Sequence, residues 1–295
     1  SDLPIATKAE IPVAICTTDT NETEVYMTTY VSADWVASCI SDPNFLIIDT
    51  RYSMRHLMGH LQHAVNVPPP KLRNPQGQLL SPNEFSDLFG AAGLGDFITP
   101  ILYDGYDGRN SAFVAWILEY LGRNDTHIMD IVYDEWKAQD REVFYRPVPR
   151  TERQFTSHIN PAVRASLEYV SHTEGLTLVD TRSLEEFEGR SDADQIPGHI
   201  PGAINVVWQA LVGRDGKLLC GEDEARRIIE EAEIDGSNTI VTYCKVGARA
   251  AVGYQTLKRL GFDVKLFDGS YSEWEKSGLP VKNPSGEGDP VSVRL

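Results

Sequence analysis

The chain has 295 residues, enough for two domains of ordinary size, and its hydrophobic content of 41% lets each domain bury a core. A formal net charge of −16 argues against a nucleic acid or an anionic membrane surface as a partner. The sequence also contains no apolar run of membrane-spanning length, so we expect no membrane partner.

The four cysteines are widely separated and lack the paired spacing of zinc or redox sites (Cys16, Cys39, Cys220 and Cys244). We therefore expect free thiols in a reducing compartment, no metal ion and no other cofactor. This expectation favours the cytoplasm. The sequence starts at Ser1 without a methionine, so a periplasmic, extracytoplasmic or organellar location after removal of a leader remains open.

Residues 1–27 are polar and rich in threonine and acidic side chains, and we expect a poorly packed N-terminal extension there. The apolar patterns that follow predict alternating helices and strands. In chain order they are a helix at 32–40, a strand at 45–49, a helix at 82–89, a strand at 101–103, a loop at 104–109 and a helix after that loop. Large apolar side chains fall on one face of this last helix at helical spacing (Phe113, Trp116, Ile117, Tyr120 and Leu121).

The second half of the chain repeats the first in the same order and at nearly constant spacing, which indicates two copies of one domain. Asp49-Thr50-Arg51 recurs as Asp180-Thr181-Arg182, Asn66 as Asn205, residues 103–109 as 243–249, and residues 130–136 as 268–274. We predict a first domain at 28–145, a linker at 146–156 that is extended and polar, a second domain at 157–284 and a tail at 285–295. The alternation of strands and helices predicts an α/β fold in which each domain is a parallel sheet flanked by helices on both faces.

The loop at 244–249 carries a cysteine between a predicted buried strand and a predicted helix. Backbone N–H groups at a helix N-terminus attract an anion, so a thiol placed there is pushed toward the nucleophilic thiolate. Lys245 and Arg249 bracket Cys244 and add positive charge. A single cysteine at a strand end is usually a small buried hydrophobe, but these neighbours favour a chemical role. We therefore predict that Cys244 is a nucleophile.

The two copies differ at this loop, because the first has Asp104 where the second has Cys244. A carboxylate can fill a ring of N–H groups structurally, but it cannot carry a transferable sulfur. We therefore expect the first copy to be chemically inactive and the second to be active.

With these residues in view, the chain resembles a tandem-domain rhodanese, a sulfurtransferase of the thiosulfate and 3-mercaptopyruvate family. The matching pieces are Asp180-Thr181-Arg182, Gly198-His-Ile-Pro-Gly-Ala-Ile-Asn205, the loop at 244–249 and the segment at 268–274. The resemblance covers roughly residues 28–284 and implies an inactive first domain and a catalytic second one.

The resemblance implies a two-step exchange. The Cys244 thiolate attacks the outer sulfur of a small anionic donor and becomes a persulfide, and cyanide or a thiol then removes the sulfur. The thiol acceptor would be a small molecule or a thioredoxin-like protein. The backbone N–H groups of the loop would hold the persulfide (Lys245, Val246, Gly247, Ala248 and Arg249), and the Lys245 and Arg249 side chains would bind the donor. Arg182 would contact the substrate or pair with an acidic neighbour, and Asp180 would support the loop.

Several alternatives remain open at this point. Lys245 directly after the cysteine favours thiosulfate, whereas family members that use 3-mercaptopyruvate tend to carry small neutral residues there. A phosphatase of related fold is less favoured, because those enzymes place one more residue between the cysteine and the arginine than the four found here. A non-catalytic sulfur-relay or binding module would use the same two-domain layout.

Overall fold

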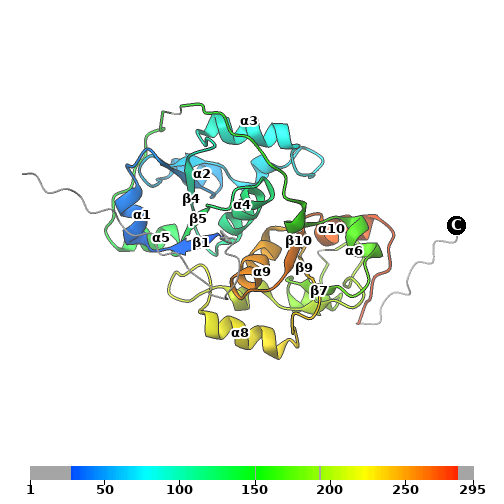
Figure 1. The fold of residues 1–295 in the computed structure, drawn as a ribbon. Coiled ribbons are helices and arrows are strands. Elements are labelled where there is room, and N and C mark those ends of the chain that lie inside the picture. The colour runs from blue at the N-terminus through cyan, green and yellow to red at the C-terminus, as the bar shows by residue number, and fades with distance from the viewer. Residues whose placement is uncertain (1–27, 150, 193, 285–295) are drawn as a thin grey trace, which may run out of the picture.

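The computed structural model describes residues 28–149, 151–192 and 194–284. The predicted extension at 1–27, the tail at 285–295 and Cys16 therefore lie outside the described residues. The described chain forms two five-stranded sheets, and every strand pair in them is parallel (Figure 1). This confirms the predicted α/β architecture.

The first domain contains one sheet and the helices around it. Its elements are β1 (Thr29–Val31), α1 (Ala33–Cys39), β2 (Phe45–Asp49), α2 (Ser53–Leu57), β3 (Val65–Asn66), η1 (Pro69–Leu72), α3 (Pro82–Ala92), β4 (Thr99–Tyr103), α4 (Arg109–Tyr120), β5 (His127–Met129) and α5 (Tyr133–Ala138). The helix predicted at 82–89 continues three residues further and then stops at Gly93, whose φ of 99° suits glycine.

The second domain contains the other sheet. Its elements are η2 (Pro161–Val163), β6 (Arg164–Ala165), α6 (Leu167–His172), β7 (Thr177–Asp180), α7 (Leu184–Phe187), β8 (Ile204–Asn205), η3 (Trp208–Leu211), α8 (Glu222–Glu231), β9 (Ile240–Tyr243), α9 (Ala248–Arg259), β10 (Val264–Phe267) and α10 (Ser270–Lys276). Helix α9 thus begins at Ala248, within the last two residues of the loop predicted at 244–249.

The strand order shows that the sequence repeat is a structural repeat. The order is β1-β5-β4-β2-β3 in the first sheet and β6-β10-β9-β7-β8 in the second, so each strand has a counterpart at the same position. The register agrees as well, because Asp49 is paired with Tyr103 and Asp180 with Tyr243. The two loops that follow these tyrosines therefore occupy equivalent sites at the carboxyl ends of the strands, where parallel sheets bind ligands.

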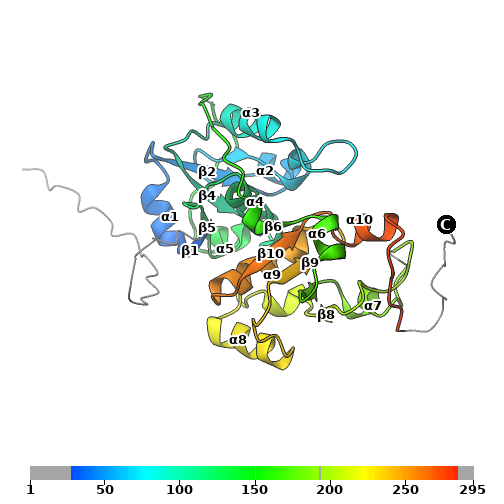
Figure 2. The same ribbon diagram turned by 45° about the vertical axis from the view of Figure 1, so that its right-hand side comes forward.

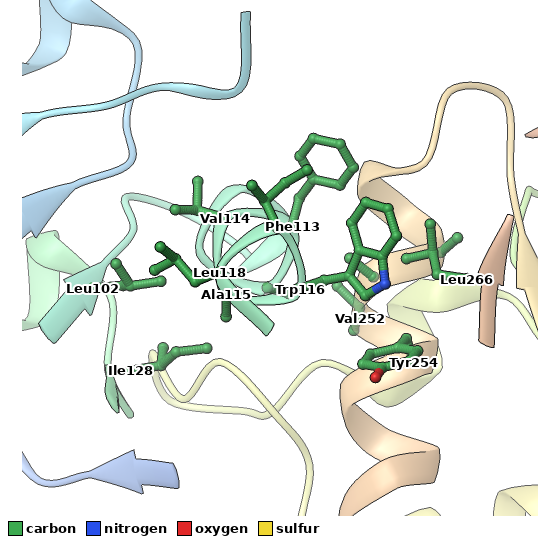
Figure 3. Close-up of a cluster of buried hydrophobic side chains, with 14 of the residues drawn as sticks. Leu102, Phe113, Val114, Ala115, Trp116, Leu118, Ile128, Val252, Tyr254 and Leu266 are labelled. Atoms are coloured by element: carbon green, nitrogen blue, oxygen red, sulfur yellow. The ribbon is translucent and has the colours of Figure 1, made fainter. Parts of the chain in front are cut away.

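The two domains pack through the helices that follow these loops. Helices α4 and α9 lie side by side between the sheets in both views (Figure 1 and Figure 2). Figure 3 shows Phe113 and Trp116 of α4 extending toward α9, which presents Val252 and Tyr254. Trp116 is fully buried, and its indole N–H donates to the carbonyl of Val163 at 3.0 Å. One apolar core therefore runs through both domains and holds the two loops at a defined separation.

The segment predicted as a polar linker at 146–156 packs on the first domain rather than lying free. Arg153 N–H donates to the Gly90 carbonyl at 3.0 Å, and the Phe155 ring lies 5.6 Å from that of Phe89, centroid to centroid. Phe155 is only 4% exposed. Because the segment is rich in proline and arginine, its sequence did not suggest that Phe155 would be buried. The exact domain bounds stay a prediction.

Candidate active site

Cys244 directly follows β9, at the N-terminal end of α9. Its side chain is 1% exposed, and Sγ accepts a hydrogen bond from the Gly247 N–H at 3.0 Å. Gly247 has a φ of 99°, and a Cβ added there would lie 3.1 Å from the Phe113 ring. Only glycine therefore lets the loop close this tightly over the sulfur. Within the described chain, Gly247 is the one backbone donor to Sγ of the free thiol. The ring of five N–H groups expected around a persulfide at residues 245–249 stays a prediction.

A turn at the start of α10 holds the backbone of the cysteine. The Cys244 N–H donates to Ser270 Oγ at 3.2 Å, and the Tyr271 N–H donates to the Cys244 carbonyl at 2.9 Å. Ser270 has a φ of 53°, a conformation that few non-glycine residues adopt. The sequence showed this segment only as part of the repeat, and it gave no sign that Ser270 supports the loop.

Lys245 extends from the loop to two carboxylates of the second domain. Its Nζ lies 2.6 Å from Asp194 Oδ1 and 2.8 Å from Glu275 Oε1. Burial alone would lower the pKa of Lys245, but these two partners raise it above its ordinary value. Burial raises the pKa of Asp194, although Lys245 and Arg182 act against that change. Lys245 is thus protonated, and its charge is partly neutralised by Asp194 and Glu275.

Arg249 makes a two-point ion pair with Glu186. Its Nη1 lies 2.6 Å from Glu186 Oε2, and its Nη2 lies 2.8 Å from Oε1. Burial would lower the pKa of Arg249, but Glu186 and the adjacent Cys244 raise it. The guanidinium therefore stays protonated between a carboxylate and the sulfur.

Arg182 does not reach the cavity, and we propose a structural role in place of the expected substrate contact. Its side chain is 0% exposed and binds Asp180 and Asp194, each through a bond shorter than 3 Å. Its guanidinium also lies 3.9 Å from the Tyr271 ring centroid. Asp180 then supports the loop only indirectly, because Arg182 holds Asp194, and Asp194 holds Lys245.

The charges of the second domain nearly cancel around the loop. Three cations are matched by four carboxylates (Lys245, Arg249 and Arg182 by Asp180, Glu186, Asp194 and Glu275). The positive charge that Lys245 and Arg249 were expected to add beside Cys244 is therefore largely offset by these carboxylates. Two arginines of the first domain, Arg55 and Arg73, have no carboxylate oxygen within 4.0 Å in the described part of the chain. Uncompensated positive charge near the loop therefore comes from the other domain.

A cavity of about 690 Å³ lies between the domains and reaches Cys244. Most of the residues that line it belong to the first domain, among them Arg51, Tyr52, Arg55, Met58, Tyr106 and Arg109. The second domain contributes the loop at 244–249 without Gly247. The sequence could not indicate these first-domain residues, because only the packing of α4 on α9 brings them opposite the cysteine.

Asp104 fills the equivalent loop of the first domain. Its Oδ1 accepts from the Gly105 N–H at 2.6 Å, and its Oδ2 accepts from the N–H groups of Asn110 and Ser111 at 2.8 and 3.2 Å. Burial raises the pKa of this carboxyl, while the three N–H donors act in the opposite direction. The carboxylate thus uses the N–H groups at the start of α4 that would otherwise face the cavity.

The described residues contain no cluster of three or more histidine, cysteine or acidic side chains that could hold a metal ion. No helix among them is long and apolar enough to cross a bilayer.

The model of the rhodanese-like domain matches the chain twice, at residues 32–139 and 155–277. The chain belongs to the rhodanese family. The thiosulfate sulfurtransferase of Corynebacterium glutamicum is 28% identical to this rhodanese over 285 residues, which cover 89% of this chain and 93% of that protein. A protein of Haloferax volcanii is 30% identical over 276 residues, which cover 85% and 95% of the two chains.

Two solved structures place this rhodanese among known folds. The 3-mercaptopyruvate sulfotransferase of Escherichia coli is similar with a TM-score of 0.74 and 28% identity, covering 83% of this chain and 99% of that one. An anaerobic ergothioneine biosynthesis enzyme from Chlorobium limicola superposes with a TM-score of 0.80 at 21% identity, covering 90% and 72%, which shows a shared fold.

Proposed function

We propose that this rhodanese is a sulfurtransferase that moves a sulfane sulfur from a small anionic donor to an acceptor through a persulfide on Cys244. The observation that carries the proposal is that Cys244 lines the interdomain cavity, with the Gly247 N–H bonded to its sulfur and Arg249 beside it. The catalytic domain is the one predicted at 157–284, and the domain at 28–145 is catalytically inactive.

In the first step the Cys244 thiolate attacks the outer sulfur of thiosulfate. A sulfur–sulfur bond forms to Cys244, the bond inside the donor breaks, and sulfite leaves with the electron pair. In the second step cyanide or a thiolate attacks the outer persulfide sulfur and regenerates the Cys244 thiolate. The Gly247 N–H and the Arg249 guanidinium favour the anionic sulfur at both stages. Neither step needs a metal ion or an external oxidant.

Thiosulfate is the donor that we favour, with 3-mercaptopyruvate as the second candidate. The relative in C. glutamicum is named for the first donor, and the structural neighbour in E. coli for the second. Thiosulfate is a dianion, and the cavity is lined by Lys245, Arg249 and Arg55, of which Arg55 has no carboxylate oxygen within 4.0 Å among the described residues. A comparison of initial rates with the two donors decides between them.

The rim of the cavity fits a thiol acceptor. Four large apolar side chains on the cavity wall are each more than half exposed (Tyr52, Met58, Tyr106 and Val246). A small thiol or a thioredoxin-like protein could approach Cys244 over this surface. The three cysteines in the described residues are free, which agrees with our proposal of a reducing, cytoplasmic location.

Mass spectrometry after treatment with thiosulfate tests the proposal. We expect the peptide that carries Cys244 to gain the mass of one sulfur atom and to lose it again when cyanide is added. Cys244→Ser should abolish turnover, with a loss of about a thousandfold or more. Cys220→Ser is the matched control, because Cys220 is also a buried free thiol but does not line the cavity.

Absence of the added sulfur, together with normal turnover in Cys244→Ser, would falsify the sulfurtransferase proposal. Hydrolysis of an aryl phosphate that depends on Cys244 would support the phosphatase alternative instead.

A further inference from the structure

Arg73 belongs to the first domain but bonds to the loop of the second. It directly follows η1, at the start of a hairpin whose other side contains Leu79. One terminal nitrogen, Nη1, donates to the Gly77 carbonyl at 2.7 Å and so ties the side chain to its own hairpin. The other nitrogen, Nη2, donates to the Val246 carbonyl at 3.0 Å and to the Asp268 carbonyl at 3.2 Å. The guanidinium thus links the hairpin to both segments that surround Cys244.

The bond to the Val246 carbonyl bears directly on the sulfur, because one peptide unit connects them. The peptide between Val246 and Gly247 is planar and trans, so its C=O and N–H point in opposite directions. Arg73 holds the C=O on one side, and on the other side the N–H donates to Cys244 Sγ at 3.0 Å. A rotation of this peptide that removed the N–H from the sulfur would also break the bond to Arg73.

The positive charge of Arg73 also strengthens the hydrogen bond from the Gly247 N–H to the sulfur. A cation bound to a carbonyl oxygen polarises the peptide and strengthens the donor at its other end. Arg73 has no carboxylate oxygen within 4.0 Å in the described part of the chain, unlike Lys245 and Arg249. The Phe113 ring of α4 lies 5.2 Å from its guanidinium carbon and restricts its position.

The corresponding contact on the other side of the interface lacks this cation. In the second domain Leu218 packs against Gly108, at 3.2 Å from a Cβ built there, as Arg73 packs against Gly247 at 3.3 Å. The Leu218 N–H donates to the Asp130 carbonyl at 3.1 Å, the counterpart of the bond between Arg73 and the Asp268 carbonyl. An apolar side chain therefore lies next to the loop of Asp104, and an arginine lies next to the loop of Cys244.

We infer that Arg73 is a positioning residue for Cys244, supplied by the domain that carries no nucleophile. It fixes the Val246–Gly247 peptide so that the N–H faces the sulfur, and it thereby favours the thiolate. The inference rests on the proposed role of Cys244 as the reacting thiol.

Alkylation of Cys244 by iodoacetamide tests the inference without any sulfur donor. The rate is followed by mass spectrometry of the Cys244 peptide between about pH 5 and pH 10, where reactivity follows the thiolate. In Arg73→Met we expect the midpoint of the pH–rate profile to rise by about one pH unit, which is a roughly tenfold change in the ionisation constant of the thiol. Arg73→Lys keeps the charge but not the fork of donors, and we expect an intermediate midpoint.

Arg123→Met is the matched control. Arg123 also donates to two backbone carbonyls, those of Gly95 and Ile98, but inside the first domain. We expect this control to lower Tm and leave the midpoint unchanged. An unchanged midpoint in Arg73→Met, with a fall in Tm like that of the control, would show a purely structural role and overturn the inference. A shifted midpoint in a protein that never accepts sulfur would support the role of Arg73 and refute only the proposed sulfur transfer.

Discussion

The two loops at the ends of β4 and β9 begin from the same position in the same fold and differ in what occupies the anion site. Asp104 reaches the N–H groups of Asn110 and Ser111 at the start of α4 and uses them. The shorter side chain of Cys244 accepts from Gly247 alone, within the loop. The carboxylate therefore uses three N–H groups of its own loop and helix, whereas the thiol uses one, and both side chains line the cavity between the domains.

The arginines that end the two loops, Arg109 and Arg249, also differ in their partners. Arg109 binds Asp107 of its own loop and lies 4.7 Å from the Trp208 ring of the other domain. Arg249 is paired with Glu186 from a different element and lies next to the sulfur. The first loop thus contributes to the domain interface, while the second keeps a cation directed at its reactive atom. In the proposed mechanism only the second copy carries out the chemistry.

The largest difference in activity should appear between variants of the two equivalent arginines, Arg249 and Arg109. Arg249→Met is expected to lower kcat/KM for thiosulfate by about a hundredfold, the usual scale for losing one donor to a developing anion. Arg109→Met, at the equivalent position, should change it by less than about threefold, because Arg109 contacts no reacting atom. Steady-state kinetics on both variants make the comparison.

A stranded carboxylate could mimic this result, since Glu186 would be left buried without its partner. The double variant Arg249→Met with Glu186→Gln addresses that point. Recovery of most of the activity in the double variant would contradict a direct role for Arg249.

The next effect concerns stability and the first loop. Asp104→Cys makes the two loops alike at this position but removes the acceptor for the N–H groups of α4. We expect a loss of about 1–3 kcal/mol in the free energy of unfolding, measured with urea. We also expect no added sulfur on the new thiol, because Arg109 at the position of Arg249 is paired with Asp107, and Leu218 lies where Arg73 lies in the other loop. A persulfide at position 104 would show that the nucleophile alone separates the active loop from the inactive one.

A smaller effect should follow from the charges around Lys245. Lys245→Ala is expected to raise KM for thiosulfate with little change in kcat, because the cation binds the donor in the ground state. Glu275→Gln keeps the shape but removes one of the two carboxylates on Nζ, so KM should fall by about threefold. Added salt should reduce both effects. Equal KM values in the two variants would exclude donor binding by Lys245.

The smallest effect is a pH dependence of stability. Burial would raise the pKa of Glu186, but its bonds to Arg249 lower it below the ordinary value. A carboxylate with a lowered pKa in the folded state stabilises the protein above its unfolded pKa of about 4.3, and this contribution disappears as the pH falls through the folded pKa. Urea midpoints between about pH 6 and pH 3 should therefore decline less steeply in Glu186→Gln. An identical slope in both proteins would argue that the pair contributes nothing to acid sensitivity.

The sequence by itself determined the duplication, the parallel α/β architecture and the position of Cys244 after a buried strand. Each of these depends on local patterns: β-branched runs such as 239–243, apolar faces such as that of α4, and the recurrence of Asp-Thr-Arg. Such patterns are visible along the chain because the period of a helix or strand is short. The difference between Asp104 and Cys244 was visible for the same reason.

Only the tertiary structure decided which cations near Cys244 are paired with carboxylates. The carboxylates that bind Lys245 and Arg249 follow or precede them by 30 to 63 positions, and nothing in their local sequence marks them as partners. Arg73 lies 173 positions from the carbonyl that it holds. Contacts of this kind arise when two completed domains pack through α4 and α9, so their geometry depends on the whole interface rather than on any segment. The physical reason is that charge and hydrogen bonding act over a few ångströms in space, whatever the separation along the chain.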